Sequence, residues 1–326
     1  MKKAFEFLNE FLNDGDTIVV GCSAGPDSMA LVDLLLRIRK NMNLSIICAG
    51  VNHKLRAESD TEMEWLEGFC KKNNIIFEGM IIKNYGDDNF HNEARNIRYN
   101  FFESLVKKYS AKYLMTAHHG DDLIETILMR IVRGSTVSGY AGFNMVVEAD
   151  NYKIVRPLIY ATKAEILKYD EDNNIHYFID KSNFSDKYTR NRYRKNVLPF
   201  LKTEELNVHL KFLKYSNMLN MYDEYISKEA NKEYKKILSE DQYIDIEGFK
   251  KLDEVIQNKI ITNLLEDYYQ DDLILISDIH TELIKSLIYS KKSNTSIYLP
   301  NSIRVIKSYD KFYFQPLTEQ IDSYEI

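Results

Sequence analysis

The sequence predicts an α/β fold: a parallel sheet covered by helices, followed by a helical connector and a small α+β domain. Over the first half of the chain, short strand-like runs alternate with helix-length amphipathic segments. This pattern is typical of right-handed βαβ units. Beyond Leu201 the alternation gives way to longer helical segments and one strand pair. We therefore expect two domains, residues 1–205 and 206–326.

The elements of the first domain follow in chain order. An amphipathic helix opens the chain and ends at Asp14-Gly15, and Ser59 with Glu62 forms a capping box for a later helix. Gly134 is expected to cap another helix at its carboxyl end. Expected strands cover residues 17–20, 44–51, 75–82, 113–117 and 154–159. Expected helices cover residues 28–39, 59–72, 92–108, 121–132 and a segment from about 162.

The second domain reads as mainly helical, with a terminal hairpin. Its strands are expected at 296–299 and 304–314, joined by turn residues at Pro300-Asn301. Its helices are expected at 205–238, 255–269 and 277–289. The domain boundary is placed near 203–210, inside a connecting helix.

Composition narrows the class of protein. The chain has 326 residues, 44% of them hydrophobic and 28% charged, which is enough for about two domains with real cores. No apolar run approaches the roughly 18 residues of a membrane span, and the first residues do not read as a signal peptide. We expect a cytoplasmic protein without membrane association. Cys22, Cys48 and Cys70 are scattered, so they are interpreted as small buried hydrophobes rather than disulfides or metal ligands.

The net charge of the chain and the local charge of one segment give opposite indications about a nucleic-acid partner. The net charge of −6 argues against a nucleic-acid partner, since phosphate binding usually needs excess Lys and Arg. Residues 181–202, however, contain seven basic residues and one acid, with Arg190, Arg192 and Arg194 close together. A solvated helix face is the simpler interpretation of such a run. The density of arginine favours an RNA backbone as partner.

The segment from Gly21 to Ser28 follows a strand and opens a helix. Its small residues let backbone N–H groups approach a phosphate at a helix N-terminus. It lacks the lysine of the common phosphate loop, and its pattern SxGxDS resembles the PP-loop of ATP pyrophosphatases. The resemblance implies that ATP binds here and that Asp27 places Mg²⁺. The ATP-binding residues it implies are Ser23, Ala24, Gly25, Pro26, Asp27 and Ser28. Where the family usually has two glycines this chain has Ala24-Gly25, and Ala24 is expected to have an ordinary negative φ. An ordinary strand–turn–helix junction is the alternative.

Three further motifs come at expected strand ends or on the following helices. Asn52 and His53 follow the second strand, and Arg98 shares a helix face with Arg95. His118, Asp122 and Glu125 belong to the segment AHHGDDLIET, residues 117–126. Because ligands bind beyond the carboxyl ends of parallel strands, we expect chemistry just after residues 20, 51 and 117. A transition-metal site built on residues 118–122 is disfavoured, since adjacent residues of one loop cannot all converge on one ion.

These motifs, with Arg156-Pro-Leu, Lys163, Asp180–Asn183 and the 190–194 arginines, resemble in order and spacing the catalytic domain of the tRNA(Ile)-lysidine synthetases. The resemblance covers about residues 15–202. It implies ATP-dependent ligation of lysine to C2 of the wobble cytidine in the CAU anticodon of tRNA(Ile). ATP and Mg²⁺ are the implied cofactors, tRNA(Ile) and L-lysine the implied partners, and a homodimer is compatible with it. Asn52 and His53 would contact ATP, and Arg98, His118, Asp122 and Glu125 would act on the substrates. The implied tRNA contacts are Arg133, Arg190, Arg192 and Arg194.

Four competing functions are weaker. Amidotransferase-linked relatives that aminate free nucleotides are one alternative, but they give no reason for the arginine run at 190–194. PP-loop thiolases that act on cytidine typically carry CxxC pairs, and this chain has none. A non-catalytic RNA-binding module would not need Ser23, Gly25, Asp27 and Ser28 together. A metal-dependent phosphohydrolase built on residues 118–122 would leave the PP-loop unexplained.

Overall fold

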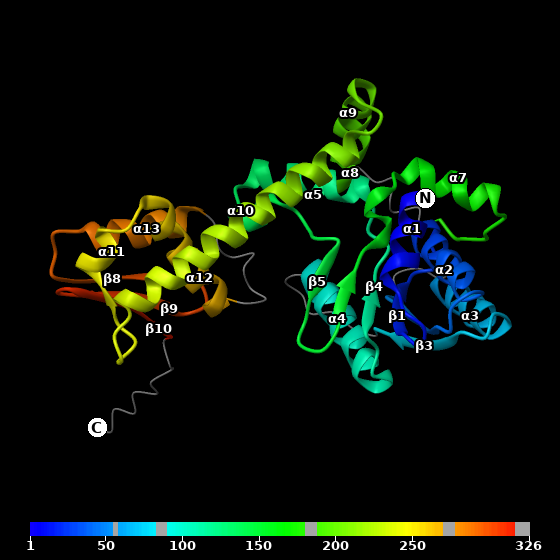
Figure 1. Ribbon diagram of the computed structural model, residues 1–326, viewed down its shortest axis with the longest axis horizontal. Coiled ribbons are helices and arrows are strands. Elements are labelled where there is room, and N and C mark those ends of the chain that lie inside the picture. Colours follow the sequence, from blue (N-terminus) through cyan, green and yellow to red (C-terminus); the bar gives the residue numbers. More distant parts are fainter. Residues whose placement is uncertain (55–57, 83–89, 180–187, 270–277, 317–326) are drawn as a thin grey trace. The chain divides into compact units, whose positions relative to one another are not determined.

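The computed structural model describes residues 1–54, 58–82, 90–179, 188–269 and 278–316. The chain forms two compact units (Figure 1). Unit 1 consists of Met1–Met129 and Gly142–Ser216, and unit 2 of Arg130–Ala141 and Asn217–Ile326. Two long helices, α5 (Gly120–Arg133) and α10 (Val208–Ile237), therefore contribute residues to both units.

Unit 1 contains a six-stranded, mostly parallel sheet, which confirms the expected fold class. Its strand order is β3-β2-β1-β4-β6-β5, and only the β5–β6 pair is antiparallel. The strands are β1 (Thr17–Cys22), β2 (Ser45–Asn52), β3 (Ile76–Ile81), β4 (Tyr113–Met115), β5 (Val146–Glu148) and β6 (Lys153–Val155). The sequence did not predict β5. It also made β6 too long, because Pro157 begins a 3-10 turn, η1 (Pro157–Tyr160).

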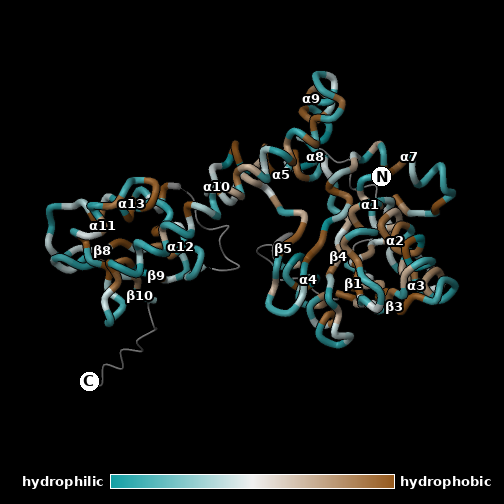
Figure 2. The backbone as a smooth tube through the Cα atoms, in the orientation of Figure 1, coloured by the Kyte–Doolittle hydropathy of each residue, from teal (hydrophilic) through white to brown (hydrophobic). Residues whose placement is uncertain are grey.

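Helices cover both faces of this sheet (Figure 1). On one face α1 (Lys2–Phe11), α2 (Pro26–Ile38) and α3 (Glu58–Lys72) pack against side chains such as Val20 and Cys48. On the other, α4 (Phe90–Tyr109) packs Phe102 and Val106 against Val19 and Ile47. Figure 2 shows the hydrophobic character of the central strands that this double burial requires. All three cysteines are buried and unbridged, as expected.

Local signals predicted some helix ends and missed others. Thr162 caps α7 (Lys163–Asp172) in a full capping box with Glu165, at the position expected for that helix start. Gly134 has a φ of +85° directly after α5, as a carboxyl-terminal cap requires. The capping box at Ser59 is wrong, because α3 begins at Glu58 and Ser59 is its second residue. The sequence also missed the helical segments α8 (Thr189–Arg192) and α9 (Leu198–Glu204), and the π-helical turn η3 (Tyr193–Val197) that joins them.

Unit 2 has its own core, built from Phe249, Phe312 and aliphatic residues of its helices and sheet. Its strands form an antiparallel sheet in the order β7-β10-β9-β8. The expected strand at 304–314 is two strands, β9 and β10, because Tyr309 turns the chain with a φ of +54°. The elements are α6 (Val137–Tyr140), β7 (Ile244–Asp245), α11 (Ile246–Lys250), α12 (Glu254–Tyr269), α13 (Asp278–Tyr289), β8 (Asn294–Leu299), β9 (Ile303–Ser308) and β10 (Lys311–Pro316). Within the described ranges of the whole chain, no helix is long and apolar enough to cross a bilayer.

Candidate active site

The loop after β1 is a compact turn that leads directly into α2. Gly25 is the N-cap of α2 and Pro26 its first residue, a position that suits proline because its missing N–H has no partner there in any case. The Ser28 hydroxyl donates to the carbonyl of Gly25 at 2.9 Å and accepts from the backbone N–H of Ser23 at 3.3 Å. The loop is thus held by its own side chains, with the N-terminus of α2 at its edge, as anion binding requires.

Ala24 contradicts the expected backbone conformation. Its φ is +56°, in the left-handed region, while Gly25 has a φ of −80°. The backbone N–H of Phe178 donates to the Ala24 carbonyl at 2.9 Å and helps to hold this conformation. Of Ala24 and Gly25, it is therefore Ala24 that adopts the left-handed backbone conformation favoured by glycine. The loop keeps its shape at the cost of backbone strain at Ala24.

A cavity of about 370 Å³ opens at the carboxyl ends of β1, β2 and β4, where the sequence placed the chemistry. A Cβ on Gly21 would lie 2.9 Å from the Phe102 ring, so glycine permits the close approach of α4 at this point. The lining residues come from four motifs and from α8; they are Gly21, Cys22, Ser23, Asp27, Ser28, Ala49, Val51, His53, Arg98, Tyr99, Phe102, Thr116, Ala117, His118, Asp122 and Arg190.

Some predicted site residues do not line this cavity. The buried Asn52 side chain donates to Asp60 at 2.7 Å and accepts from the Lys54 N–H at 2.8 Å, so it shapes the β2 end. Arg192 is exposed and donates to Thr189 at 3.0 Å. Arg133 is exposed at the end of α5, in unit 2. The predicted Asp180–Asn183 motif, with Lys181 and Lys187 of the basic run, lies outside the described residues.

Lys163 is a site residue to which the sequence analysis gave no role. Its ammonium lies 2.5 Å from Oδ1 of Asp27, across 136 positions of sequence. It is the first residue of α7 after the Thr162 cap. That capping box, directly after the Arg156-Pro-Leu motif, was the available signal. The pair places a cation beside the PP-loop, where the loop itself has none.

Asp122 and Glu125, two of the predicted substrate residues, lie at the start of α5, and two arginines contact them. Nε of Arg190 lies 2.8 Å from Glu125 Oε2, and Nε of Arg194 lies 2.7 Å from Glu125 Oε1. Arg194 also reaches Asp122 Oδ1 at 3.3 Å. Residues predicted to act on the substrates and residues predicted to bind tRNA are thus partners of each other.

The surroundings of two titratable groups in the cavity, His118 and Asp122, lower their pKa values. Burial, aided by the charges of Arg156, Arg190 and Arg95 and opposed by Asp122, lowers the pKa of His118 to about 3. His118 is therefore neutral at pH 7, and its Nδ1 lies 2.9 Å from the Thr116 hydroxyl. Burial raises the pKa of Asp122, but the stronger combined effect of His119, Arg190 and other donors holds that pKa well below its ordinary value.

Asp121 points away from this cavity. It is buried, and its Oδ2 accepts from Lys202 at 2.6 Å and from the backbone N–H of Lys163 at 3.0 Å. This separates Asp121 from Asp122 and removes the basis for a phosphohydrolase centre at 118–122. In the described part of the chain no three His, Cys, Asp or Glu side chains are grouped as metal ligands.

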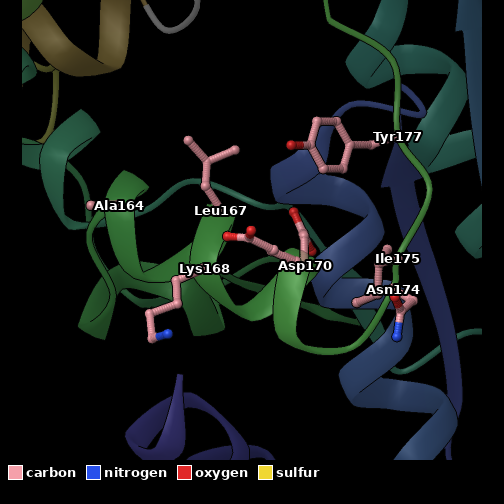
Figure 3. Close-up of a pocket in the computed structure, with 8 residues that line it drawn as sticks. Ala164, Leu167, Lys168, Asp170, Asn174, Ile175 and Tyr177 are labelled. Atoms are coloured by element: carbon pink, nitrogen blue, oxygen red, sulfur yellow. The ribbon is translucent and has the colours of Figure 1, made fainter.

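A second cavity, of about 780 Å³, lies beside α7 (Figure 3). Asp170 lines it, yet the residue is fully buried and neither carboxyl oxygen has a hydrogen-bond partner among the described residues. Burial, with the nearby negative charge of Asp27, raises the pKa of Asp170 to about 7. Helix α7 therefore brings both a cation, Lys163, and a carboxyl group with a strongly raised pKa close to Asp27 of the PP-loop.

Comparison with known proteins agrees with this geometry. Residues 1–201 match a family described as a PP-loop domain. The chain is 36% identical over 329 residues to the tRNA(Ile)-lysidine synthase of Bacillus cereus, covering 97% of this chain and 69% of that protein. It is 33% identical over 321 residues to that of Geobacillus kaustophilus, covering 96% and 69%.

The chain belongs to the tRNA(Ile)-lysidine synthase family. Among solved structures, a U34-tRNA thiolase from Methanococcus maripaludis that carries a [4Fe-4S] cluster matches with a TM-score of 0.58 and 16% identity. The match covers 67% of this chain and 76% of the thiolase, and it shows that the fold is shared. The PP-loop domain makes this lysidine synthase family member an ATP-binding protein.

Proposed function

We propose that this protein ligates lysine to C2 of the wobble cytidine in the CAU anticodon of tRNA(Ile), using ATP. The observation that carries the proposal is the single cavity that joins the PP-loop to Arg98, His118 and Asp122. One cavity with an anion-binding end and an acidic end suits a reaction that joins a nucleotide, a base and an amine. Family membership supports the same reaction.

The reaction divides into two balanced steps. The C2 oxygen of cytidine attacks the α-phosphorus of ATP, and the bond to the β-phosphate oxygen breaks to release pyrophosphate. The lysine amine then attacks C2, the C2–O bond breaks, and AMP leaves with the oxygen. Forming the adenylate turns a poor leaving group into a good one, which is the purpose of the ATP.

Each end of the cavity supplies a different part of this chemistry. The Ser23–Ser28 loop and the Lys163 ammonium would hold the β- and γ-phosphates, since Lys163 lies beside the loop through its contact with Asp27. Arg98, which lines the cavity, would steady phosphate or the developing negative charge. Asp122, with its low pKa, suits an ammonium partner rather than a base. His118, whose strongly lowered pKa makes it a weak base, would contact the substrates as a neutral hydrogen-bonding group.

Asp27 fits a role in placing Mg²⁺. Its carboxylate is about one-third exposed and lies at the start of α2 beside the phosphate loop. Protein sites for Mg²⁺ commonly use one or two carboxylates together with substrate phosphates. The ion would neutralise charge on the departing pyrophosphate.

The test uses purified protein, magnesium-ATP, radiolabelled lysine and transcripts of tRNA(Ile) with a CAU anticodon and of tRNA(Met). Label should enter only the isoleucine transcript, with one AMP released for each lysine incorporated. A protein that binds ATP but labels neither transcript would contradict the proposal and favour another PP-loop activity.

The lysine site has its own test. Asp122→Asn with Glu125→Gln should raise the KM for lysine by at least about tenfold, because each buried charged contact is worth 1–3 kcal/mol. The KM for ATP is the internal control. An unchanged KM for lysine would remove these carboxylates from the lysine site.

A further inference from the structure

Among the described residues, two of the chain's own arginines hold the carboxylate of Glu125. Its side chain is 1% exposed, and both of its oxygens accept from guanidinium groups. Arg190 donates to Oε2 at 2.8 Å, and Arg194 donates to Oε1 at 2.7 Å and to Oε2 at 3.0 Å. A buried carboxylate needs such compensation, because an unpaired charge in the interior is strongly unfavourable.

The carboxylates and the arginines of this cluster differ in how freely their side chains can move. Glu125 and its neighbour Asp122 lie on the first turns of α5 and are anchored there, with Asp122 also accepting from the His119 N–H at 3.1 Å. The arginine side chains are 41% and 37% exposed, so each can turn into solvent without unpacking a core. Arg190 lies on α8 and Arg194 on the π-helical turn η3. Such turns are rare, and they frequently occur at functional sites.

The arginines therefore stand where a substrate cation would stand. A guanidinium and an ammonium are alternative partners for the same carboxylate oxygens. The same guanidinium groups are also alternative partners for RNA phosphates, which they bind through the same donors. In the structure the arginines therefore occupy the carboxylate oxygens that lysine would contact, and the carboxylates occupy the guanidinium donors that RNA phosphates would contact.

We propose that lysine and tRNA both compete with the ion pairs that join the two carboxylates to Arg190 and Arg194. Each ligand therefore binds more tightly when the other is present. This rests on the proposed function, in which Asp122 and Glu125 receive the lysine ammonium. Lysine releases Arg190 and Arg194 to phosphate, and tRNA draws the arginines away and exposes the carboxylates to lysine. The coupling is reciprocal by thermodynamic necessity.

Coupling is measured without ATP, so that no turnover occurs. The Kd of the tRNA(Ile) transcript is determined at one salt concentration, with and without saturating L-lysine, and the Kd of lysine is determined with and without the transcript. Lysine should tighten tRNA binding by about tenfold, within the range usual for coupled sites. The Kd of lysine should fall by the same factor.

Three variants separate this device from a simple structural role. Glu125→Gln frees the arginines permanently, so its lysine-free form should bind tRNA as tightly as the wild type does with lysine. Arg194→Ala removes a competitor and should tighten lysine binding in the absence of tRNA, whereas an arginine that merely orients the site would weaken it when removed. Arg192→Ala, on the same helix but bonded to Thr189, should weaken tRNA binding equally with and without lysine.

The outcomes distinguish the inference from the function on which it rests. A wild-type protein with the same tRNA Kd in the presence and absence of lysine overturns the coupling, even if Glu125→Gln raises the KM for lysine. An unchanged KM for lysine in Glu125→Gln overturns the lysine site itself. Should Glu125→Gln fail to fold, weaker lysine binding in Arg194→Ala overturns the exchange and tighter binding supports it.

Discussion

Lys202 Nζ lies 2.6 Å from Oδ2 of Asp121, and neither residue lines the cavity beside the PP-loop. The adjacent residue, Asp122, lines the cavity and contacts Arg194. Two neighbouring carboxylates of one motif thus have different partners. Asp121 also accepts from the first backbone N–H of α7, so it joins α5, α7 and α9, while Asp122 faces the proposed substrates.

The Asp121–Lys202 pair should contribute stability rather than catalysis. Lys202→Met leaves the buried carboxylate without its cation, and we expect it to lower the free energy of unfolding by about 3 kcal/mol. The KM for lysine should stay within about twofold of the wild type. Urea unfolding followed by circular dichroism measures the first quantity. Lys195→Met, at an exposed position of η3, is the control, and equal stability of the two variants would contradict the assignment.

Lys163 should be required for ATP. Replacing it with methionine removes the cation beside Asp27 while keeping most of the side-chain volume, and we expect the KM for ATP to rise by at least about tenfold because a charge-assisted contact to phosphate is lost. Pyrophosphate release measured against ATP concentration gives the value. Lys168→Met, on the same helix but paired with Asp172 in solvent, should behave as the wild type. A matching KM for both variants would place Lys163 outside the ATP site.

Ala24 makes the PP-loop sensitive to side-chain shape. Ala24→Gly relieves about 1–2 kcal/mol of left-handed strain but removes a buried methyl group worth about 0.8 kcal/mol and adds freedom to the unfolded chain. Its stability should therefore stay within about 1 kcal/mol of the wild type. Ala24→Val places a β-branched residue at a φ of +56° and should be destabilised and lose ATP binding. Thermal melting and ATP titration check both, and a stable, ATP-binding valine variant would refute the strain argument.

Asp170 should make the protein less stable as the pH rises. The pKa of its carboxyl group in the fold is about 7, above its value of 3.8 in the unfolded chain. Both states are protonated below pH 3.8, and the unfolded state alone loses its proton between about pH 4 and 7. Stability from this group is therefore lost across that window as pH increases.

Asp170→Asn removes the titration, so it should stabilise the protein by a few kcal/mol at pH 8 and much less at pH 4.5. Melting temperatures of both proteins at the two pH values measure this difference. A stabilisation that is the same at both pH values would show that Asp170 does not titrate in this range.

Much of the fold was determined by local sequence. The alternation of buried-strand runs and amphipathic helices predicted the parallel sheet, and the helical pattern after residue 161 predicted the start of α7. Elements that depend on residues elsewhere in the chain were harder to predict. Pro157 ended β6 early, and the short edge strand β5 is specified by pairing with β6 rather than by its own pattern.

The same division holds for the site. The sequence by itself determined the PP-loop and the strand ends where polar residues such as Asp122 and Glu125 gather, because these depend on spacing along a few consecutive residues. Only the tertiary structure decided that Lys163 meets Asp27 and that Arg190 and Arg194 meet Glu125, across 136, 65 and 69 positions. It alone decided the left-handed φ of Ala24 as well. Such pairings follow from how helices pack on the sheet, and no local pattern of residue types encodes which distant charge will reach a buried carboxylate.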